Sequence, residues 1–174
     1  MRKVLIWMAV IAVFAIVAVI VFAADQADPL PDDIKVDRVV VEKSRRVLSL
    51  YSGDTLLKTY NIALGSSPEG HKQQQGDDRT PEGTYLIDYR NPQSSYHLSL
   101  HVSYPNQDDK ERAVERGVSP GGDIFIHGLP PNFAWVGAMH TISDWTDGCI
   151  AVSNKEIEEL WRVVPNGTSI ELRP

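Results

Sequence analysis

Hydrophobic and polar residues alternate along most of the chain after its first 35 residues, with the two-residue period of β-strands. The clearest case is 96–104, where Leu98 and Leu100 share one face with later apolar residues and His97 and His101 share the other with serines. Similar short runs, rich in β-branched and aromatic residues, recur further along. We expect strands at 36–44, 45–52, 55–64, 83–91, 96–104, 123–128, 148–152 and 168–173.

Two segments have the pattern of short helices instead. Residues 108–117 begin with two acidic side chains and end at Gly117, as expected of a solvated helix. In the second segment, Ser153 and Glu156 have the spacing of a capping box, and Pro165 ends the helix. Its hydrophobic positions are Ile157, Leu160, Trp161 and Val164. The sequence therefore predicts a mainly β fold with two short helices.

The first 24 residues differ from the rest. Val4 to Ala24 is an uncharged run of 21 residues, which as a helix would span about 31 Å and cross a bilayer core. Arg2 and Lys3 precede it, an arrangement that keeps the N-terminus in the cytoplasm and exports the rest of the chain. We therefore predict an N-terminal transmembrane helix or signal segment at 1–24. A signal peptide cleaved after Ala23 is the alternative to an uncleaved anchor.

One domain is expected behind this segment. Residues 25–35 are polar and acidic and contain two prolines, so we expect a short extended linker. Residues 36–174 then have the size of a single domain. With or without cleavage, this domain is expected to work outside the cytoplasm, in the periplasm or an equivalent extracytoplasmic space, anchored to the cytoplasmic membrane if 4–24 is retained.

The charge of the exported part excludes one class of partner. Arg2 and Lys3 are the only charged side chains before Asp25, so the rest has 15 basic and 23 acidic side chains and a formal net charge of −8. A basic stripe that could bind phosphate backbones is missing, and we expect no nucleic acid partner. The polar, glycine-rich segment 65–83 is long for a compact domain, and such loops often form lids or binding rims.

Cys149 is the only cysteine in the 174 residues. In a cytosolic protein a single cysteine is usually a small buried hydrophobic residue. In an exported protein, where cysteines are normally paired, an unpaired one indicates a reactive thiol or an intermolecular partner. Both interpretations are open on this evidence alone.

A reactive thiol needs a base, and the chain has five histidines. His127 ends an apolar strand and precedes Gly128, a position from which a catalytic ring could leave the sheet; a structural histidine is the alternative. His97 and His101 lie about 13 Å apart along an extended strand, too far to chelate one metal ion alone. A metal enzyme that combines these two with His127 is a minor alternative, and we expect no metal and no cofactor.

Several motifs together are similar to those of the L,D-transpeptidase catalytic-domain family, cysteine enzymes that modify peptidoglycan. The family's His-Gly pair is matched by His127-Gly128, and its Ser/Thr-x-Gly-Cys stretch by 146–149. The segments VEKSRRVLSLYSGDTLLKTYNIALGSSPEG, GDDRTPEGTYLI and SPGGDIFIHG resemble further family blocks in the same order. The similarity extends from about Val36 to Pro174, and it implies a β-sandwich catalytic domain.

The resemblance also implies roles for individual residues. Cys149 corresponds to the nucleophile that attacks a peptide carbonyl of a peptidoglycan stem and holds the acyl fragment as a thioester, and His127 to its base. Gly128 would orient His127 through its carbonyl, and the N–H groups around Gly148 and Cys149 would bind the oxyanion. Further cleft residues considered are Thr146, Asp147, His97, His101, Trp145 and the loop 65–83. For the two histidines an ordinary solvated sheet face is the alternative, and for Trp145 simple packing.

Two positions depart from the family pattern. Many members have histidine or arginine where Asp147 stands, and arginine where Ala151 stands, so DWTDGCIAV resembles a distinct branch. Both changes remove a positive charge, and Asp147 would oppose ionisation of the thiol. The expected activity is acyl transfer from stem peptides to an amine, which forms cross-links or attaches a protein to the wall. A hydrolase of the same chemistry and a non-catalytic wall-binding module are the alternatives.

Overall fold

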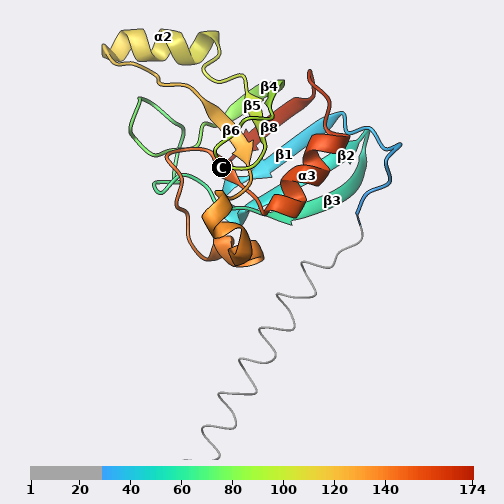
Figure 1. Cartoon of the computed structure of the whole chain (residues 1–174). Coiled ribbons are helices and arrows are strands. Elements are labelled where there is room, and N and C mark those ends of the chain that lie inside the picture. The colour runs from blue at the N-terminus through green and yellow to red at the C-terminus, as the bar shows by residue number, and fades with distance from the viewer. Residues whose placement is uncertain (1–28) are drawn as a thin grey trace, which may run out of the picture.

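The computed structural model describes residues 29–174, which form a curved eight-stranded sheet with helices against it and at its ends (Figure 1). The predicted segment 1–24 and the first residues of the linker 25–35 lie outside this range. Within it, no helix is long and apolar enough to cross a membrane. The strands are β1 (Arg38–Glu42), β2 (Val47–Ser52), β3 (Thr55–Asn61), β4 (Gly83–Asn91), β5 (Ser99–Val102), β6 (Ile124–His127), β7 (Ile150–Ala151) and β8 (Ser169–Arg173).

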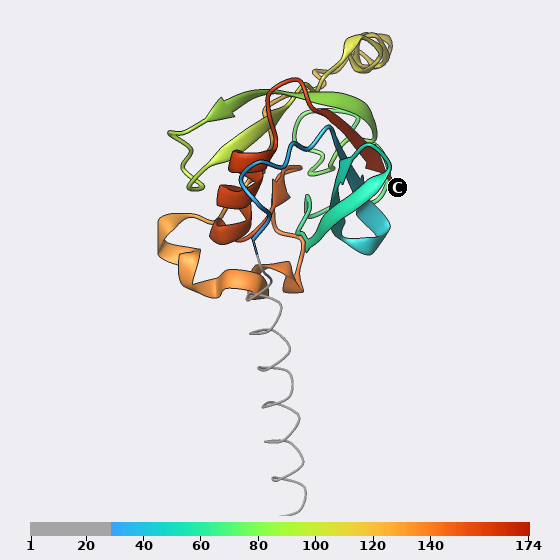
Figure 2. The same ribbon diagram turned by 90° about the vertical axis from the view of Figure 1, so that its right-hand side faces the viewer.

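The sheet has the order β3-β2-β1-β8-β4-β5-β6-β7, and β4 joins its two halves. Residues 83–86 of β4 pair with β8, and 87–91 pair with β5, with an irregular register between Ile87 and Tyr89. The sheet bends along this strand, as Figure 2 shows. The mainly β prediction is confirmed. The expected sandwich is instead a half-barrel built from one sheet in the described residues, because β4 continues through both halves.

Both predicted helices are present, as α2 (Gln107–Arg116) and α3 (Asn154–Val163). Each begins with a capping box. The Asn106 side chain accepts a hydrogen bond from the Asp109 N–H, and the Ser153 hydroxyl accepts one from the Glu156 N–H. These caps satisfy backbone N–H groups that the first turn of a helix leaves without partners. α3 packs Ile157, Leu160 and Val163 into the core.

Two 3-10 helices, η1 (Lys43–Arg45) and η2 (Pro131–Ile142), were not predicted. η2 is interrupted at Gly137, whose φ of 52° and ψ of −134° are not helical, so it has no regular apolar stripe that a sequence pattern could reveal. η2 and α2 lie at opposite ends of the domain (Figures 1 and 2). The exposed large apolar side chains of η2 are Phe133, Trp135, Met139 and Ile142.

The core holds the chain around β7 in place. Ile126 of β6 and Ile150 of β7 are fully buried, and burying such a side chain contributes about 1.5–3 kcal/mol. Isolated bridges join Ala63 to Ala151 and Gly65 to Thr146. The segment before β7, which contains the single cysteine, is therefore fixed between β6 on one side and 63–65 on the other.

Candidate active site

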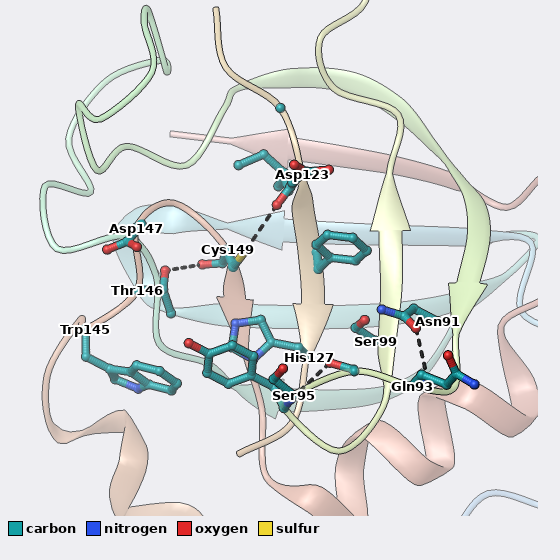
Figure 3. Close-up of a pocket in the computed structure, with 15 residues that line it drawn as sticks. Asn91, Gln93, Ser95, Ser99, Asp123, His127, Trp145, Thr146, Asp147 and Cys149 are labelled. Carbon is teal, nitrogen blue, oxygen red and sulfur yellow. Dashed lines mark hydrogen bonds between the residues drawn. The ribbon is translucent and has the colours of Figure 1, made fainter. Parts of the chain in front are cut away.

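A cavity of about 430 Å³ lies beside β5, β6 and β7 (Figure 3). It brings together His127, Thr146, Asp147 and Cys149, four of the residues predicted from the sequence. Its full lining is Asn91, Gln93, Ser94, Ser95, Tyr96, Ser99, Gly122, Asp123, Ile124, Phe125, His127, Trp145, Thr146, Asp147 and Cys149. Three separate segments of the chain, 91–99, 122–127 and 145–149, therefore form one site.

The pairing of β6 with β7 places His127 and Cys149 on the same face. The two strands are parallel, with His127 opposite Ala151. Cys149 comes two residues before Ala151, so its register position is beside Phe125, and successive side chains alternate between faces. Both side chains line the cavity, and Figure 3 shows Cys149 with Asp123 on one side and His127 on the other.

The Cys149 thiol is partly buried and is protonated at neutral pH. The pKa of Cys149 is raised to about 11, mainly by burial; a hydrogen bond from the Phe125 backbone acts in the opposite direction, and the charge of Asp147 contributes to the rise. The S–H donates to the Asp123 carbonyl, with 3.5 Å between Sγ and O. A thiol in this state needs a neighbouring base before it can act as a nucleophile.

The His127 ring is held as a neutral base. It is buried, and burial lowers its pKa, although its bond to Gly128 acts in the opposite direction. Nδ1 lies 2.7 Å from the Gly128 carbonyl oxygen. Because a carbonyl can only accept, we assign the proton to Nδ1, which leaves a lone pair on Nε2. Ring centroids of Tyr96 and Trp145 lie 4.4 and 5.8 Å from that of His127. The hydrogen bond between His127 Nδ1 and the Gly128 carbonyl is the orienting contact that the family resemblance implied.

A tight turn precedes the thiol. The Thr146 hydroxyl accepts from the Gly148 N–H at 3.2 Å and donates to the Cys149 carbonyl at 2.7 Å. The Gly148 amide is thus engaged inside the turn, whereas the Cys149 N–H has no hydrogen-bond partner within residues 29–174. Of the two predicted oxyanion donors, the Cys149 amide is therefore the one without a partner in the described residues, as an oxyanion donor has to be before a ligand binds.

Gly148 occupies a position that other residues fit poorly. Its φ is +127°, and an added Cβ would lie 2.6 Å from the Arg79 carbonyl oxygen. We expect Gly148→Ala to lower the free energy of unfolding by about 2–4 kcal/mol, from backbone strain and from the contact. Urea denaturation followed by tryptophan fluorescence measures this. Gly167→Ala is the matched control, since Gly167 has a φ of +90° but nothing within 4 Å of an added Cβ. Equal losses in both variants would contradict the contact.

Asp147 is exposed and raises the pKa of the neighbouring thiol. We expect Asp147→Asn to lower the pKa of Cys149 and to accelerate its alkylation by iodoacetamide roughly twofold at a fixed pH below that pKa, because solvent screens the charge. Asp54→Asn, in the exposed turn between β2 and β3, removes the same charge far from the site. Equal acceleration in this control would assign the effect to net charge rather than to Asp147.

The other two predicted histidines lie outside this cavity lining. His97 Nε2 lies 2.7 Å from Glu158 Oε1, and His101 Nδ1 lies 2.5 Å from Asp88 Oδ1. His97 has a φ of +70° and β5 begins only at Ser99, so the predicted alternation across 96–104 breaks there. The two rings do not join His127. In the described part of the chain, no group of three or more His, Cys, Asp or Glu could hold a metal ion.

Some lining residues were not predicted. Tyr96 and the polar loop 91–95 connect two strands, and Asp123 precedes β6 with a φ of +56°. The available signal was the polar insertion NPQSS between two alternating runs. The loop 65–83, expected at the cleft, instead contributes to a neighbouring cavity of about 420 Å³ that shares Gly122, Asp123 and Asp147 with the first.

The chain is similar to known proteins in sequence. The family model described as YkuD, the L,D-transpeptidase catalytic domain, matches residues 36–172. YafK of Escherichia coli (strain K12), named as a candidate L,D-transpeptidase, is 30% identical over 132 residues, which cover 72% of this chain and 46% of that protein. YkuD of Bacillus licheniformis, named in the same way, is 30% identical over 149 residues, 83% of this chain and 69% of that protein.

The fold is also similar to a solved structure. The helical cell shape determining protein Pgp2 from Campylobacter jejuni has a TM-score of 0.61 and 27% sequence identity, covering 80% of this chain and 48% of that one. The chain therefore spans about half the length of YafK and of Pgp2.

Proposed function

The chain belongs to the L,D-transpeptidase catalytic-domain family, and on that basis we propose that it is a cysteine-dependent acyltransferase of the cell wall. It would cleave a peptide bond of a peptidoglycan stem through a thioester on Cys149 and pass the acyl group to an amine. The observation that supports this most directly is the cavity shared by Cys149 and His127, in which Nδ1 is bound to Gly128 and Nε2 is available to take a proton.

In the first step, the thiol would turn from the Asp123 carbonyl toward His127, and Nε2 would take its proton as Sγ attacks the stem carbonyl carbon. The Cys149 N–H would stabilise the oxyanion, and the Gly128 carbonyl would stabilise the imidazolium. When the tetrahedral intermediate collapses, the C–N bond breaks and the leaving amine takes the proton from Nε2. The acyl group remains on sulfur as a thioester.

In the second step, an acceptor amine attacks the thioester and gives a proton to Nε2. A new amide forms, and the proton returns to the departing sulfur. Asp147 and Asp123 both line the cavity, so their negative charge would attract an acceptor amine in its ammonium form rather than a carboxylate, and the ammonium gives one proton to solvent before the neutral amine attacks. This supports transfer to an amine as the main reaction. With water as the acceptor, the same residues would hydrolyse the thioester.

Location and biological role are part of the proposal. Peptidoglycan lies outside the cytoplasm, and the apolar run Val4 to Ala24 would hold the domain at the outer face of the membrane. The stem peptides are the proposed substrate, and a protein attached to the wall is a second possible acyl acceptor or donor. Since the name of Pgp2 concerns helical cell shape, we extend the proposal to a contribution to cell shape.

The test is to incubate the purified chain with peptidoglycan and identify the products by mass spectrometry. New amide links between stems, or between a stem and a protein, are the expected result. Shortened stems or released protein fragments without new amides would assign hydrolysis instead. Products identical to those of an enzyme-free incubation would contradict both acyl transfer and hydrolysis. If the chain then bound peptidoglycan in a pull-down, the non-catalytic wall-binding module would be favoured.

A further inference from the structure

A second cavity, of about 340 Å³, lies next to the one that holds the thiol. Tyr96 and Trp145 line both cavities, so they form a shared wall. The second cavity is at the lower end of the volume range of ligand sites, roughly 300–1,000 Å³. Leu129 and three side chains of η2, Phe133, Val136 and Met139, give it a largely apolar lining.

His140 is the unusual residue of this cavity. The side chain is 6% exposed, and neither ring nitrogen has a hydrogen-bond partner among residues 29–174. A buried polar atom without a partner is unfavourable, and such atoms are rare in native proteins. His140 is one of the residues that line the cavity, but both ring nitrogens are buried beneath its surface, so a ligand there could supply the missing bonds only after a small movement of the ring.

The charge state of His140 limits what that ligand can be. The pKa of His140 is lowered to about 4, mainly by burial and to a smaller extent by the nearby His127 ring. The ring is therefore neutral near pH 7 and offers one N–H donor and one acceptor nitrogen. No Asp, Glu, Lys or Arg belongs to the lining, whose other polar groups are the hydroxyls of Ser143 and Tyr96, the indole N–H of Trp145 and main-chain groups. A charged ligand would lose its hydration without gaining an opposite charge.

We propose that this second cavity binds an uncharged peptide residue with a large apolar side chain, which packs on Leu129 and η2 while its amide group hydrogen-bonds the His140 ring. The cavity is much larger than an alanine methyl group. Because Tyr96 and Trp145 line both cavities, a peptide held at the thiol can continue past them into this site. That the occupant is part of the substrate rests on the proposed function, whereas binding at His140 does not.

Binding can be measured without turnover. The probe is N-acetyl-L-phenylalaninamide, added to the full chain in mild detergent as the Cys149→Ala variant. NMR of histidine ring nitrogens and of Leu, Val and Met methyl groups follows the titration. We expect saturable shifts at His140, Leu129, Val136 and Met139, with a dissociation constant on the order of 1 mM for a ligand of this size. N-acetyl-glycinamide, which lacks the side chain, should bind much more weakly.

Variants separate His140 from general effects. His140→Phe keeps the ring volume without polar nitrogens and should weaken probe binding about 3–10-fold, as the loss of one or two hydrogen bonds predicts. His140→Gln retains a donor and an acceptor, so it should bind the probe more tightly than His140→Phe. If the phenylalanine variant does not fold, His140→Gln is compared with the wild type in its place. His97→Phe is the matched control, since His97 lies outside both cavities, and should bind like the wild type.

The proposal would be overturned if the His140 signals showed no saturable shifts at probe concentrations well above the expected dissociation constant of about 1 mM. Buried water would then be the partner of the ring. Equal affinity in all variants would also overturn it. A separate measurement compares KM with kcat for wall substrates in His140→Phe; a raised KM with a nearly unchanged kcat is expected if the occupant is substrate. Probe binding without any wall turnover would sustain the site and refute the proposed function alone.

Discussion

Replacing Cys149 with alanine is expected to abolish product formation from peptidoglycan, lowering the rate by at least ~10⁴-fold. The reason is that no other thiol exists in the chain to replace the nucleophile. The fold should survive, since the thiol bonds only main-chain groups, the Phe125 backbone and, at a long 3.5 Å, the Asp123 carbonyl. Chromatography of muropeptides gives the initial rates, and a thermal melt checks folding.

Cys149→Ser is the matched control for shape. Its hydroxyl fits the same space, but it is a far weaker nucleophile that His127 has to deprotonate from a much higher pKa, so the variant should also be inactive. In the wild type, brief exposure to substrate followed by acid should leave an acyl adduct on the peptide that contains Cys149. Turnover that persists in the alanine variant, or an adduct on another residue, would refute Cys149 as the nucleophile.

The second large effect is expected at His127. His127→Gln should lower the rate about 10²–10⁴-fold, the usual contribution of a positioned general base. Glutamine still offers an N–H toward the Gly128 carbonyl, so loss of activity would reflect the missing base rather than a collapsed turn. His97→Gln, at the partly exposed ring bonded to Glu158, should keep full activity.

The pH profile gives a further test of the same residue. Burial lowers the pKa of His127, and its neutral form is the one that accepts a proton. Activity should therefore fall with decreasing pH only below 6.5, the ordinary value for an exposed histidine. The residual rate of His127→Gln should lack this acidic limb. An identical limb in both proteins would show that another group titrates there.

The sequence predicted the repetitive parts of this structure well. Alternating, β-branched and short apolar runs located all eight strands, and the capping pattern at Ser153 and Glu156 located α3, because these signals are local. The single cysteine and the His127-Gly128 pair likewise identified two side chains that the fold brings into one cavity. The parallel pairing of β6 with β7, which sets their relative positions, joins segments 24 residues apart and leaves no local signal.

The remaining errors have local causes as well. His97 was placed on a strand, but its positive φ and the start of β5 at Ser99 turn it toward Glu158. The segment that forms η2 looked like a loop because Gly137 breaks its helical geometry. His140 consequently carried no sequence signal, although it is one of the buried polar residues of the domain.

The burial of His140 also links folding to proton uptake. In the unfolded chain its pKa is 6.5, and in the folded domain burial lowers it to about 4. Between these values the unfolded state binds a proton that the folded state does not, so the free energy of unfolding falls as the pH decreases through this interval and is unaffected above it. The loss from His140 amounts to about 3 kcal/mol once the pH is below 4.

His127 acts in the same direction, because burial lowers its pKa too. The melting temperature should therefore fall progressively between about pH 6.5 and 4, and His140→Phe should flatten this dependence; an unchanged slope in that variant would contradict the linkage. If the domain works outside the cytoplasm, as proposed, no cytosolic buffer sets the pH around it, and the survival of the folded protein would then depend on the acidity of the surroundings. Under the same proposal, the buried imidazole would make the protein an acid-labile component of the cell envelope.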